Sequence, residues 1–337
     1  MSPSVSLSLV IPSFNRADLI VETIRSALDQ TYPFAEIIIV DDASTDSTIT
    51  DLLQFGDKIT VIASSKIGVQ RARNKGVSVA KTSYVTLCDS DDLLLPDYVE
   101  KISQWLLAHS ECDSVYCNFC TFDEKKIDKD KFSAAPSGYF DGSLKEGEFL
   151  SEIPELYGKT VLFQPLFSSG VTIRKSFYES LGGYDPSFNG IGSEDWEYTL
   201  RAVQDGKTSV CLSPLVRIRR HSGNDSNNQI RMLLGEVSVM EHALRNHKEA
   251  TNYRQSIRYS INKRRIEAFE LAFGMKQYDK AASILASITE KTGNFKFHVK
   301  VMLAQLIGSK RFGNSANIKE GISAVPVNNS AIGPVRE

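Results

Sequence analysis

Residues 36–48 read EIIIVDDASTDST, and this stretch gives the clearest indication of the fold class. Its first five residues are almost all apolar, as expected of a parallel strand that is covered on both faces. The strand stops at the paired acids Asp41 and Asp42, and the Ser and Thr residues that follow are typical of a turn leading into a helix. The stretch therefore predicts a buried strand with acidic side chains at its carboxyl end.

The flanking sequence repeats this alternation of strand and helix. Strands are predicted at residues 6–11, 59–63 and 83–88, and helices at residues 17–30, 47–55 and 69–81. Helices of this length between strands indicate βαβ units and a parallel sheet. Ligands bind such sheets at the carboxyl ends of the strands. The side chains that fall there are Pro12, Asp41, Asp42, Asp89 and Asp91.

Further elements are predicted beyond the first hundred residues. Residues 121–165 are rich in Lys, Asp, Gly and Pro, and we expect them to form a mobile excursion over the sheet. A strand, two helices and another strand are then predicted at residues 170–173, 174–181, 194–205 and 210–218. The fold class is therefore α/β, with a mixed, mostly parallel sheet flanked by helices and a C-terminal helical appendage.

Charge divides the chain near residue 228. Acidic residues outnumber basic ones in residues 1–228, whereas basic residues outnumber acidic ones in residues 229–312. The first part is predicted to be the ligand-binding domain. The second predicts amphipathic helices, including a hairpin that turns at Gly274. Residues 313–337 are rich in Ser, Asn, Gly and Pro without periodicity, which predicts a disordered tail.

The basic region, residues 229–312, has two interpretations. Residues 298–312 mix apolar and basic side chains, which suggests peripheral contact with an anionic membrane surface. The alternative is a helical cap on the first domain or the interface of a homodimer. No nucleic-acid-binding motif accompanies the basic residues, so no nucleic-acid partner is expected.

Composition restricts the class of protein. The chain has 337 residues, of which 42% are hydrophobic and 24% charged, enough for a large globular domain and a smaller appendage. No run approaches the roughly 20 apolar residues of a membrane-spanning helix, and the N-terminus does not read as a signal peptide. Cys112, Cys117 and Cys120 lack a second CxxC pair, which disfavours structural zinc. We therefore expect reduced thiols and a cytoplasmic protein. The alternative location is peripheral attachment to the inner face of the membrane.

An acidic cluster, Asp89-Ser90-Asp91-Asp92, follows the fourth predicted strand. Strand alternation would put Asp89 and Asp91 on the same side. Paired carboxylates attract Mg²⁺ or Mn²⁺, and such an ion neutralises the charge that develops on a diphosphate leaving group. The alternative is a helix start at which Asp91 and Asp92 serve as caps. The cluster alone does not decide between a metal site and a cap.

Six segments together resemble a known family. In order they are VIPSFNR (10–16), IIVDDASTDST (38–48), RARNKG (71–76), LCDSDD (87–92), GGYDPSF (182–188) and GSEDWEYTLRAVQDG (192–206). This series resembles glycosyltransferase family 2 over about residues 5–225. The resemblance implies the nucleotide-sugar-binding fold called GT-A and an inverting, metal-dependent transfer of a sugar. Ala43 departs from the glycine that is commonest after the paired aspartates.

The resemblance also implies a site for the nucleotide. Pro12, Phe14 and Asn15 would line the base pocket. Asp42 would accept a hydrogen bond from the base, a match typical of uracil or thymine that favours a UDP-sugar donor. The alternative role of Asp42 is to cap a turn. Arg73 would face the diphosphate or the base.

Metal and sugar contacts follow from the same resemblance. Asp89 and Ser90 would bind the ribose or the sugar, and Asp91 would be the main ligand of Mn²⁺ or Mg²⁺, as in the family's DxD motif. His221 would be a further metal ligand, because a neutral imidazole binds such ions. The alternative for His221 is an exposed loop residue without a ligand.

Glu194 and Asp195 form the second acidic cluster. An acceptor hydroxyl is a weak nucleophile, and a positioned carboxylate can take its proton during attack. The resemblance assigns this general base to Asp195 and the orientation of the acceptor to Glu194. The alternative is that both acids only stabilise the N-terminus of a helix.

Other functions are less consistent with the sequence. A dehydrogenase would need a glycine-rich turn after the first strand, where this chain has Pro12-Ser13-Phe14-Asn15-Arg16. A catalytically inactive scaffold that binds nucleotide-sugars or carbohydrates is the remaining alternative, although the acids of both clusters are present. The predicted partners are a nucleotide-sugar donor and a growing glycan or lipid-linked acceptor. The sequence does not identify the sugar.

Overall fold

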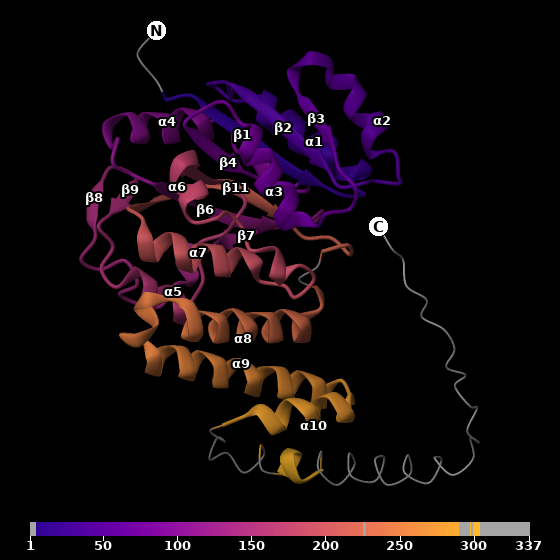
Figure 1. Ribbon diagram of the computed structural model, residues 1–337, viewed down its shortest axis with the longest axis vertical. Helices are drawn as coiled ribbons and strands as arrows, with labels where there is room; N and C mark the ends of the chain where they lie inside the picture. Colours follow the sequence, from indigo (N-terminus) through magenta and orange to yellow (C-terminus); the bar gives the residue numbers. More distant parts are fainter. Residues whose placement is uncertain (1–4, 225–226, 290–296, 298, 304–337) are drawn as a thin grey trace, which may run out of the picture. The chain divides into compact units, whose positions relative to one another are not determined.

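The computed structural model describes residues 5–224, 227–289, 297 and 299–303 (Figure 1). The chain divides between Arg264 and Arg265 into two compact units, which are described separately. The predicted boundary near residue 228 stays a prediction. Residues 313–337, the predicted tail, lie outside the described residues, as do residues 304–312 of the predicted helical region.

An 11-stranded sheet runs through the described part of the first unit. Its strands lie in the order β3 (Thr60–Ala63), β2 (Glu36–Asp41), β1 (Leu7–Ser13), β4 (Tyr84–Leu87), β10 (Val171–Arg174), β6 (Ser114–Phe122), β11 (Thr208–Arg219), β9 (Phe149–Ser151) and β8 (Leu144–Glu146). Two further strands pair beside this path, β5 (Leu93–Leu94) with β11 and β7 (Ile127–Asp130) with β6.

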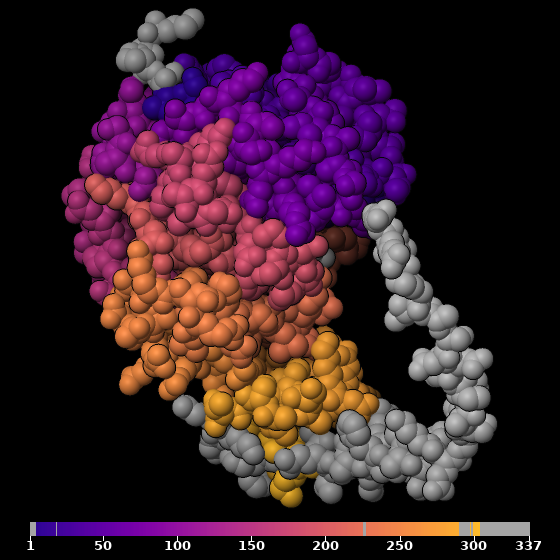
Figure 2. Space-filling model, viewed as in Figure 1, coloured from indigo at the N-terminus to yellow at the C-terminus, as the bar shows by residue number. Residues whose placement is uncertain are grey.

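Strand directions agree with the predicted fold class. β1 is parallel to β2 and β4, and β2 is parallel to β3. β10 is antiparallel to both of its neighbours, β4 and β6, and β11 is parallel to β6. The sheet is therefore mixed with a mostly parallel core, as predicted. Figure 2 shows the residues of the first four strands and their helices gathered in one continuous region, coloured indigo to purple.

Helices flank the sheet on both faces (Figure 1). Those of the first unit are α1 (Ala17–Leu28), α2 (Thr48–Leu52), α3 (Val69–Val79), α4 (Tyr98–Ala108), α5 (Leu156–Leu162), α6 (Lys175–Ser180), α7 (Glu194–Asp205) and α8 (Gln229–Asn246). Short 3₁₀ turns lie at Leu53–Lys58, Phe132–Ala134, Pro186–Phe188 and Lys248–Thr251. α9 (Arg254–Gly274) runs from the first unit into the second.

Alternating side chains of the central strands form two cores. In β2, Ile37 and Ile39 pack with residues of α1 and α4, whereas Ile38 and Val40 pack with residues of α3 and α7. Successive side chains of a strand point to opposite faces, so an unbroken apolar run fills both cores. A third cluster joins α7, α8 and the first turns of α9. The apolar stretch from which the fold was predicted therefore lies at the centre of the sheet.

Residues 121–165 differ from the prediction. They form β7, β8, β9 and α5, and β9 pairs with β11 in the sheet. Phe149, Leu150 and Val161 are buried in the three apolar clusters. The expectation of a mobile excursion was wrong, because two or three apolar residues in a short strand give too weak a pattern to stand out among Lys, Asp and Gly.

The second unit contains the end of α9 and α10 (Tyr278–Ser287). α9 ends at Gly274, which confirms the predicted hairpin turn. Phe269, Phe273 and Tyr278 pack along this hairpin in tilted and edge-to-face pairs, with ring centres 5.4 to 6.0 Å apart. Within the described residues, no helix has the length and apolar character needed to cross a membrane.

Candidate active site

The turn after β1 is fastened to the loop after β2. The backbone N–H of Asn15 donates to Ser44 Oγ at 2.9 Å, and Asn15 Oδ1 accepts from the N–H of Thr45 at 2.8 Å. Asn15 has a φ of 50°, a conformation that asparagine adopts more readily than most residues. Pro12 is buried in β1, whereas Phe14 is 39% exposed and lies below Lys66. The predicted base pocket thus has one exposed aromatic ring at its edge.

Asp41 and Asp42 accept hydrogen bonds from different parts of the chain. The Asp41 carboxylate accepts from the N–H and hydroxyl of Ser44, so it holds the turn. Asp42 accepts from the N–H groups of Ile67 and Gly68 at 2.6 and 2.7 Å and from a serine hydroxyl. A carboxylate has about four acceptor positions, which leaves one on Asp42. Asp42 therefore shapes the loop before α3, and its contact with a base stays a prediction.

Arg73 joins the two acidic clusters. Its Nη2 donates to Asp89 Oδ1 at 2.6 Å, and its Nη1 donates to Glu194 Oε1 at 3.1 Å. The residue is 3% exposed, and its guanidinium lies over the ring of Tyr184. Burial alone would lower the pKa of Arg73, but its acidic neighbours raise that pKa well above its ordinary value. The carboxyl end of β4 and the start of α7 therefore share one charge network.

The loop after β4 is a turn rather than a continued strand. β4 ends at Leu87, and Ser90 and Asp91 lie in the turn, so strand alternation does not apply. Asp89 is directed at Arg73, whereas the buried Asp91 has other partners. The predicted common side for the two acids was therefore wrong. Ser90 is buried within this turn.

Asp92 anchors the same turn, a role that sequence reasoning missed. Its carboxylate accepts from the Ser169 hydroxyl at 2.5 Å and from the N–H of Arg219 at 2.9 Å. Burial and the charge of Asp91 raise the pKa of Asp92 well above its ordinary range. Ser169 also accepts from the N–H of Asp89 at 2.9 Å. No local pattern around Ser169 distinguishes it in the sequence.

Asp91 and His221 form a pair with the chemistry of metal ligands. His221 Nε2 lies 3.0 Å from Asp91 Oδ2, and Arg16 Nε lies 3.4 Å from the same oxygen. Two ligands of one octahedral Mg²⁺ ion are separated by about 3.0 Å, because each bond is about 2.1 Å long. Such ions need only one or two protein ligands when substrate phosphates complete the shell. The pair therefore fits the predicted ion, while Asp89 is held by Arg73.

Asp195 lies in the first turn of α7 and is half-buried. Burial, together with the charge of the adjacent Glu194, raises the pKa of Asp195 to about 7. Ser193, which precedes the helix, has a φ of 61° and gives no side-chain cap. A carboxylate with a pKa near neutrality suits proton abstraction better than a fully solvated one. A carboxyl group with a pKa near neutrality therefore lies next to Glu194, which Arg73 binds.

Part of the chain matches a known protein family. Residues 8–161 match the family described as Glycosyl transferase family 2. This part of the chain, residues 8–161, belongs to that family. The match begins in β1 and covers the acids after β2 and β4 together with Arg73.

Several bacterial glycosyltransferases are similar to this chain. TuaG of Bacillus subtilis, a glycosyltransferase named for teichuronic acid biosynthesis, is 37% identical over 145 residues, which cover 41% of this chain and 57% of TuaG. Glycosyltransferase GlyG of Streptococcus pneumoniae is 37% identical over 35% of this chain and 40% of its own length. This chain thus spans about half the length of these relatives. WfaP of Escherichia coli, named UDP-Glc:alpha-D-GlcNAc-diphosphoundecaprenol beta-1,3-glucosyltransferase, is 26% identical over 70% of this chain and 85% of WfaP.

The fold is similar to that of a solved enzyme. The structure of Staphylococcus aureus TarS residues 1–349 in complex with UDP-GlcNAc superposes with a TM-score of 0.60. The alignment covers 84% of this chain and 80% of that one at 16% identity. At this identity the likeness establishes the fold, and it agrees with the GT-A fold predicted from the sequence.

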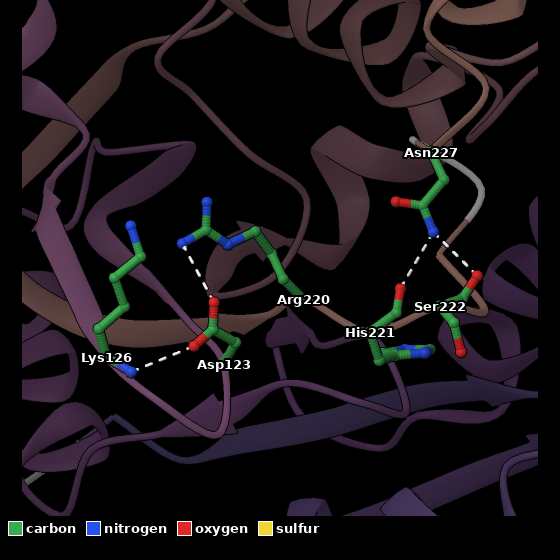
Figure 3. Close-up of a pocket in the computed structure, with 6 residues that line it drawn as sticks. All are labelled: Asp123, Lys126, Arg220, His221, Ser222 and Asn227. Carbon is green, nitrogen blue, oxygen red and sulfur yellow. Dashed lines mark hydrogen bonds and ion pairs between the residues drawn. The ribbon is translucent and has the colours of Figure 1, made fainter.

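A polar hollow lies beside His221. It has a volume of about 480 Å³ and is lined by Asp123, Lys126, Arg220, His221, Ser222 and Asn227 (Figure 3). Asp123 lies between Lys126 and Arg220, and Asn227 donates to the backbone carbonyls of His221 and Ser222. Asp123 and Lys126 were missed because they fall in the segment predicted to be irregular.

Proposed function

We propose that this family 2 glycosyltransferase moves a sugar from a UDP-sugar to an acceptor hydroxyl and inverts the anomeric configuration. The observation that carries the proposal is the contact of Arg73 with both Asp89 and Glu194. These acids are far apart in the sequence, and one buried side chain brings their clusters to a common region. A donor site and an acceptor base must be neighbours for direct transfer.

On the donor side, Asp91 and His221 would hold a divalent cation, Mn²⁺ or Mg²⁺. The ion would supply positive charge that stabilises the diphosphate leaving group. Arg16, beside Asp91, contributes a fixed positive charge to the same area. The exposed ring of Phe14 offers an apolar face to the uracil. The remaining acceptor position of Asp42 is assigned to a base N–H.

On the acceptor side, Asp195 takes the proton of the attacking hydroxyl. Its pKa of about 7 is close to the working pH, so the carboxylate both ionises and accepts a proton readily. Glu194 orients the acceptor and is itself oriented by Arg73. Attack from the side opposite the nucleotide gives inversion.

Two relatives support the choice of a UDP-sugar. TarS is described in complex with UDP-GlcNAc, and the name of WfaP gives a UDP-Glc donor and a diphosphoundecaprenol acceptor. We therefore infer a UDP-hexose donor and a glycan or lipid-linked acceptor for this chain. Assembly of a cell-surface polysaccharide is consistent with the name of TuaG.

Donor hydrolysis with a panel of UDP-sugars tests the proposed activity. We expect metal-dependent release of UDP from at least one sugar, and D195N should reduce the rate of transfer by about 100- to 10,000-fold. Asp205→Asn is the matched control, because Asp205 lies at the opposite end of α7 and pairs with Lys248. A chain that binds UDP and Mn²⁺ but hydrolyses and transfers none of these sugars would instead be a binding scaffold.

The basic region remains a separate proposal. Val299, Met302 and Leu303 are exposed near Lys300, which is consistent with peripheral contact with an anionic membrane from the cytoplasmic side. Co-sedimentation with anionic and neutral liposomes tests this contact. Equal binding to both would contradict it, and a concentration-dependent dimer would favour the alternative interface.

A further inference from the structure

Three potential metal ligands meet between α7 and the end of α8. They are Glu197 from α7, His242 from α8 and His247, which follows α8 directly. One donor atom from each lies within 4.8 Å of the other two. Glu197 is 1% exposed and His247 is 8% exposed, so the group is not a solvated surface cluster. Among the described residues, no other trio of such side chains meets this criterion.

His247 has a buried nitrogen without a hydrogen-bond partner in the part of the chain that is described. Its Nε2 is shielded from solvent and unpaired, whereas its Nδ1 lies 3.0 Å from the hydroxyl of Tyr157. Buried polar atoms are nearly always satisfied, so an orphan nitrogen indicates a missing partner.

Glu197 is held in place by Arg201. Its two carboxylate oxygens accept from Arg201 Nε and Nη2, both at 2.6 Å. Each oxygen keeps a further lone pair, so the contact with Arg201 leaves room for another ligand bond. His242 Nε2 lies 3.9 Å from Glu197 Oε1, too far for a hydrogen bond. Arg201 therefore compensates the buried charge of Glu197, but it does not explain why two histidines lie beside that carboxylate.

We propose that Glu197, His242 and His247 bind a divalent transition-metal ion of the Zn²⁺ type. Two imidazoles and one carboxylate are a common Zn²⁺ donor set, and they leave a fourth position for water. Ligands about 2.0–2.1 Å from a tetrahedral ion are about 3.3 Å apart, so small side-chain rotations close the trio. Tyr157, hydrogen-bonded to Nδ1 of His247, would fix the orientation of that ring while Nε2 binds the ion.

The proposed ion would fasten α7 to the end of α8. Glu197 lies one half-turn after Asp195, the proposed base, on the same helix. The ion is distinct from that assigned to Asp91 and His221, because the ligands come from other elements and include two imidazoles. Its effect would be to hold the base in place rather than to contact the substrate.

Metal content and binding of the full chain test the proposal. The protein is stripped with a chelator and dialysed against Zn²⁺, and Co²⁺ is used as a spectroscopic probe of tetrahedral binding. A D91N background removes the other proposed site. We expect one Zn²⁺ per chain in this background, a loss of affinity of at least 100-fold in H242Q and H247Q, and a loss of about 10- to 100-fold in Y157F.

The control is His109→Gln. His109 also lies near one carboxylate, that of Glu146, but has no third ligand, so its loss should leave Zn²⁺ affinity unchanged. His242 is partly exposed, which makes H242Q the variant that keeps the fold intact, as circular dichroism would verify. Absence of stoichiometric Zn²⁺ in D91N, or equal affinity in H242Q and the control, would overturn the proposal.

Discussion

His221 Nε2 lies 3.0 Å from Asp91 Oδ2, although 130 positions separate the two residues. The contact joins the turn after β4 to the segment after β11, and it is bordered by Arg16 from the turn after β1. Residues from three loops therefore meet at one carboxylate. The burial of Asp91 makes the pair costly to disturb, because a desolvated acid that loses one of its partners is left with less compensation for its charge.

Asp91→Asn is expected to remove metal-dependent activity. The amide is a weaker ligand for a hard cation, so the Mn²⁺ concentration required for half-maximal donor hydrolysis should rise by at least 10-fold and the rate should fall by about 100-fold or more. Titration of Mn²⁺ against UDP release measures both. Asp97→Asn is the control, since Asp97 is close in sequence but pairs with Lys101 at the start of α4. An unchanged metal requirement would contradict the assignment of Asp91.

Arg73→Lys tests the bridge between the two clusters. Lysine keeps the charge but lacks the planar fork that reaches Asp89 and Glu194 together. We expect kcat to fall by about 100-fold, since loss of one buried charge-assisted hydrogen bond costs about 3 kcal/mol. Arg71→Lys, two positions away and exposed, should have no effect. Equal kcat values for the two variants would show that the bridge does not position the site.

Activity should fall as the pH drops through about 7. The pKa of Asp195 is raised to about 7 by burial and by Glu194, and only the ionised form accepts a proton. The plot of log(kcat/KM) against pH should therefore rise with a slope of one up to about pH 7 and then level off. Changing Glu194 to Gln removes a repelling charge and should move this midpoint to lower pH. A midpoint that stays in place would contradict the coupling of the two acids.

The raised pKa of Asp195 also lowers the free energy of unfolding above neutral pH. Its folded pKa exceeds the unfolded value of about 3.9, so the unfolded state loses its proton first as pH rises. The penalty is absent below about pH 4, grows up to about pH 7 and is then constant. D195N should therefore melt at a higher temperature than the wild type at pH 8 and at a similar temperature at pH 4. Lower stability of D195N at pH 8 would contradict this account.

The sequence predicted those parts whose signals are local. The apolar run before Asp41 produced β2, and the boundaries of α7 at Glu194 and Asp205 agree with the prediction because acids and a turn mark its start. Asp91 and His221 were assigned to one metal from a family resemblance, and the structure brings them together. Their role as metal ligands stays a prediction.

Other features depend on contacts between distant segments and could not be predicted. The bridge from Arg73 to Glu194 spans 121 positions, and the anchor from Ser169 to Asp92 spans 77. The sequence around a single serine or arginine contains no pattern that indicates which distant residue it will contact. The same holds for His247, whose unpaired nitrogen becomes visible only when α7 and α8 are packed together.

Gly235 packs closely against the loop that precedes α7. It lies within α8, and a Cβ atom there would approach the carbonyl oxygens of Ile191 and Gly192 to 2.8 Å. Glycine to alanine inside a helix normally stabilises a protein by about 1 kcal/mol. Here the added methyl group must push backbone rather than a flexible side chain, so the loop before Asp195 is displaced.

Gly235→Ala should therefore lower both the melting temperature and kcat, the latter by about 10- to 100-fold, while leaving the affinity for UDP unchanged. Thermal unfolding, transfer kinetics and calorimetry with UDP and Mn²⁺ measure the three effects. Gly274→Ala is the control, because no atom lies within 4 Å of its added Cβ. If G235A were more stable than the wild type and equally active, the loop would accommodate the added methyl group without being displaced. The packing of α8 would then not set the position of Asp195.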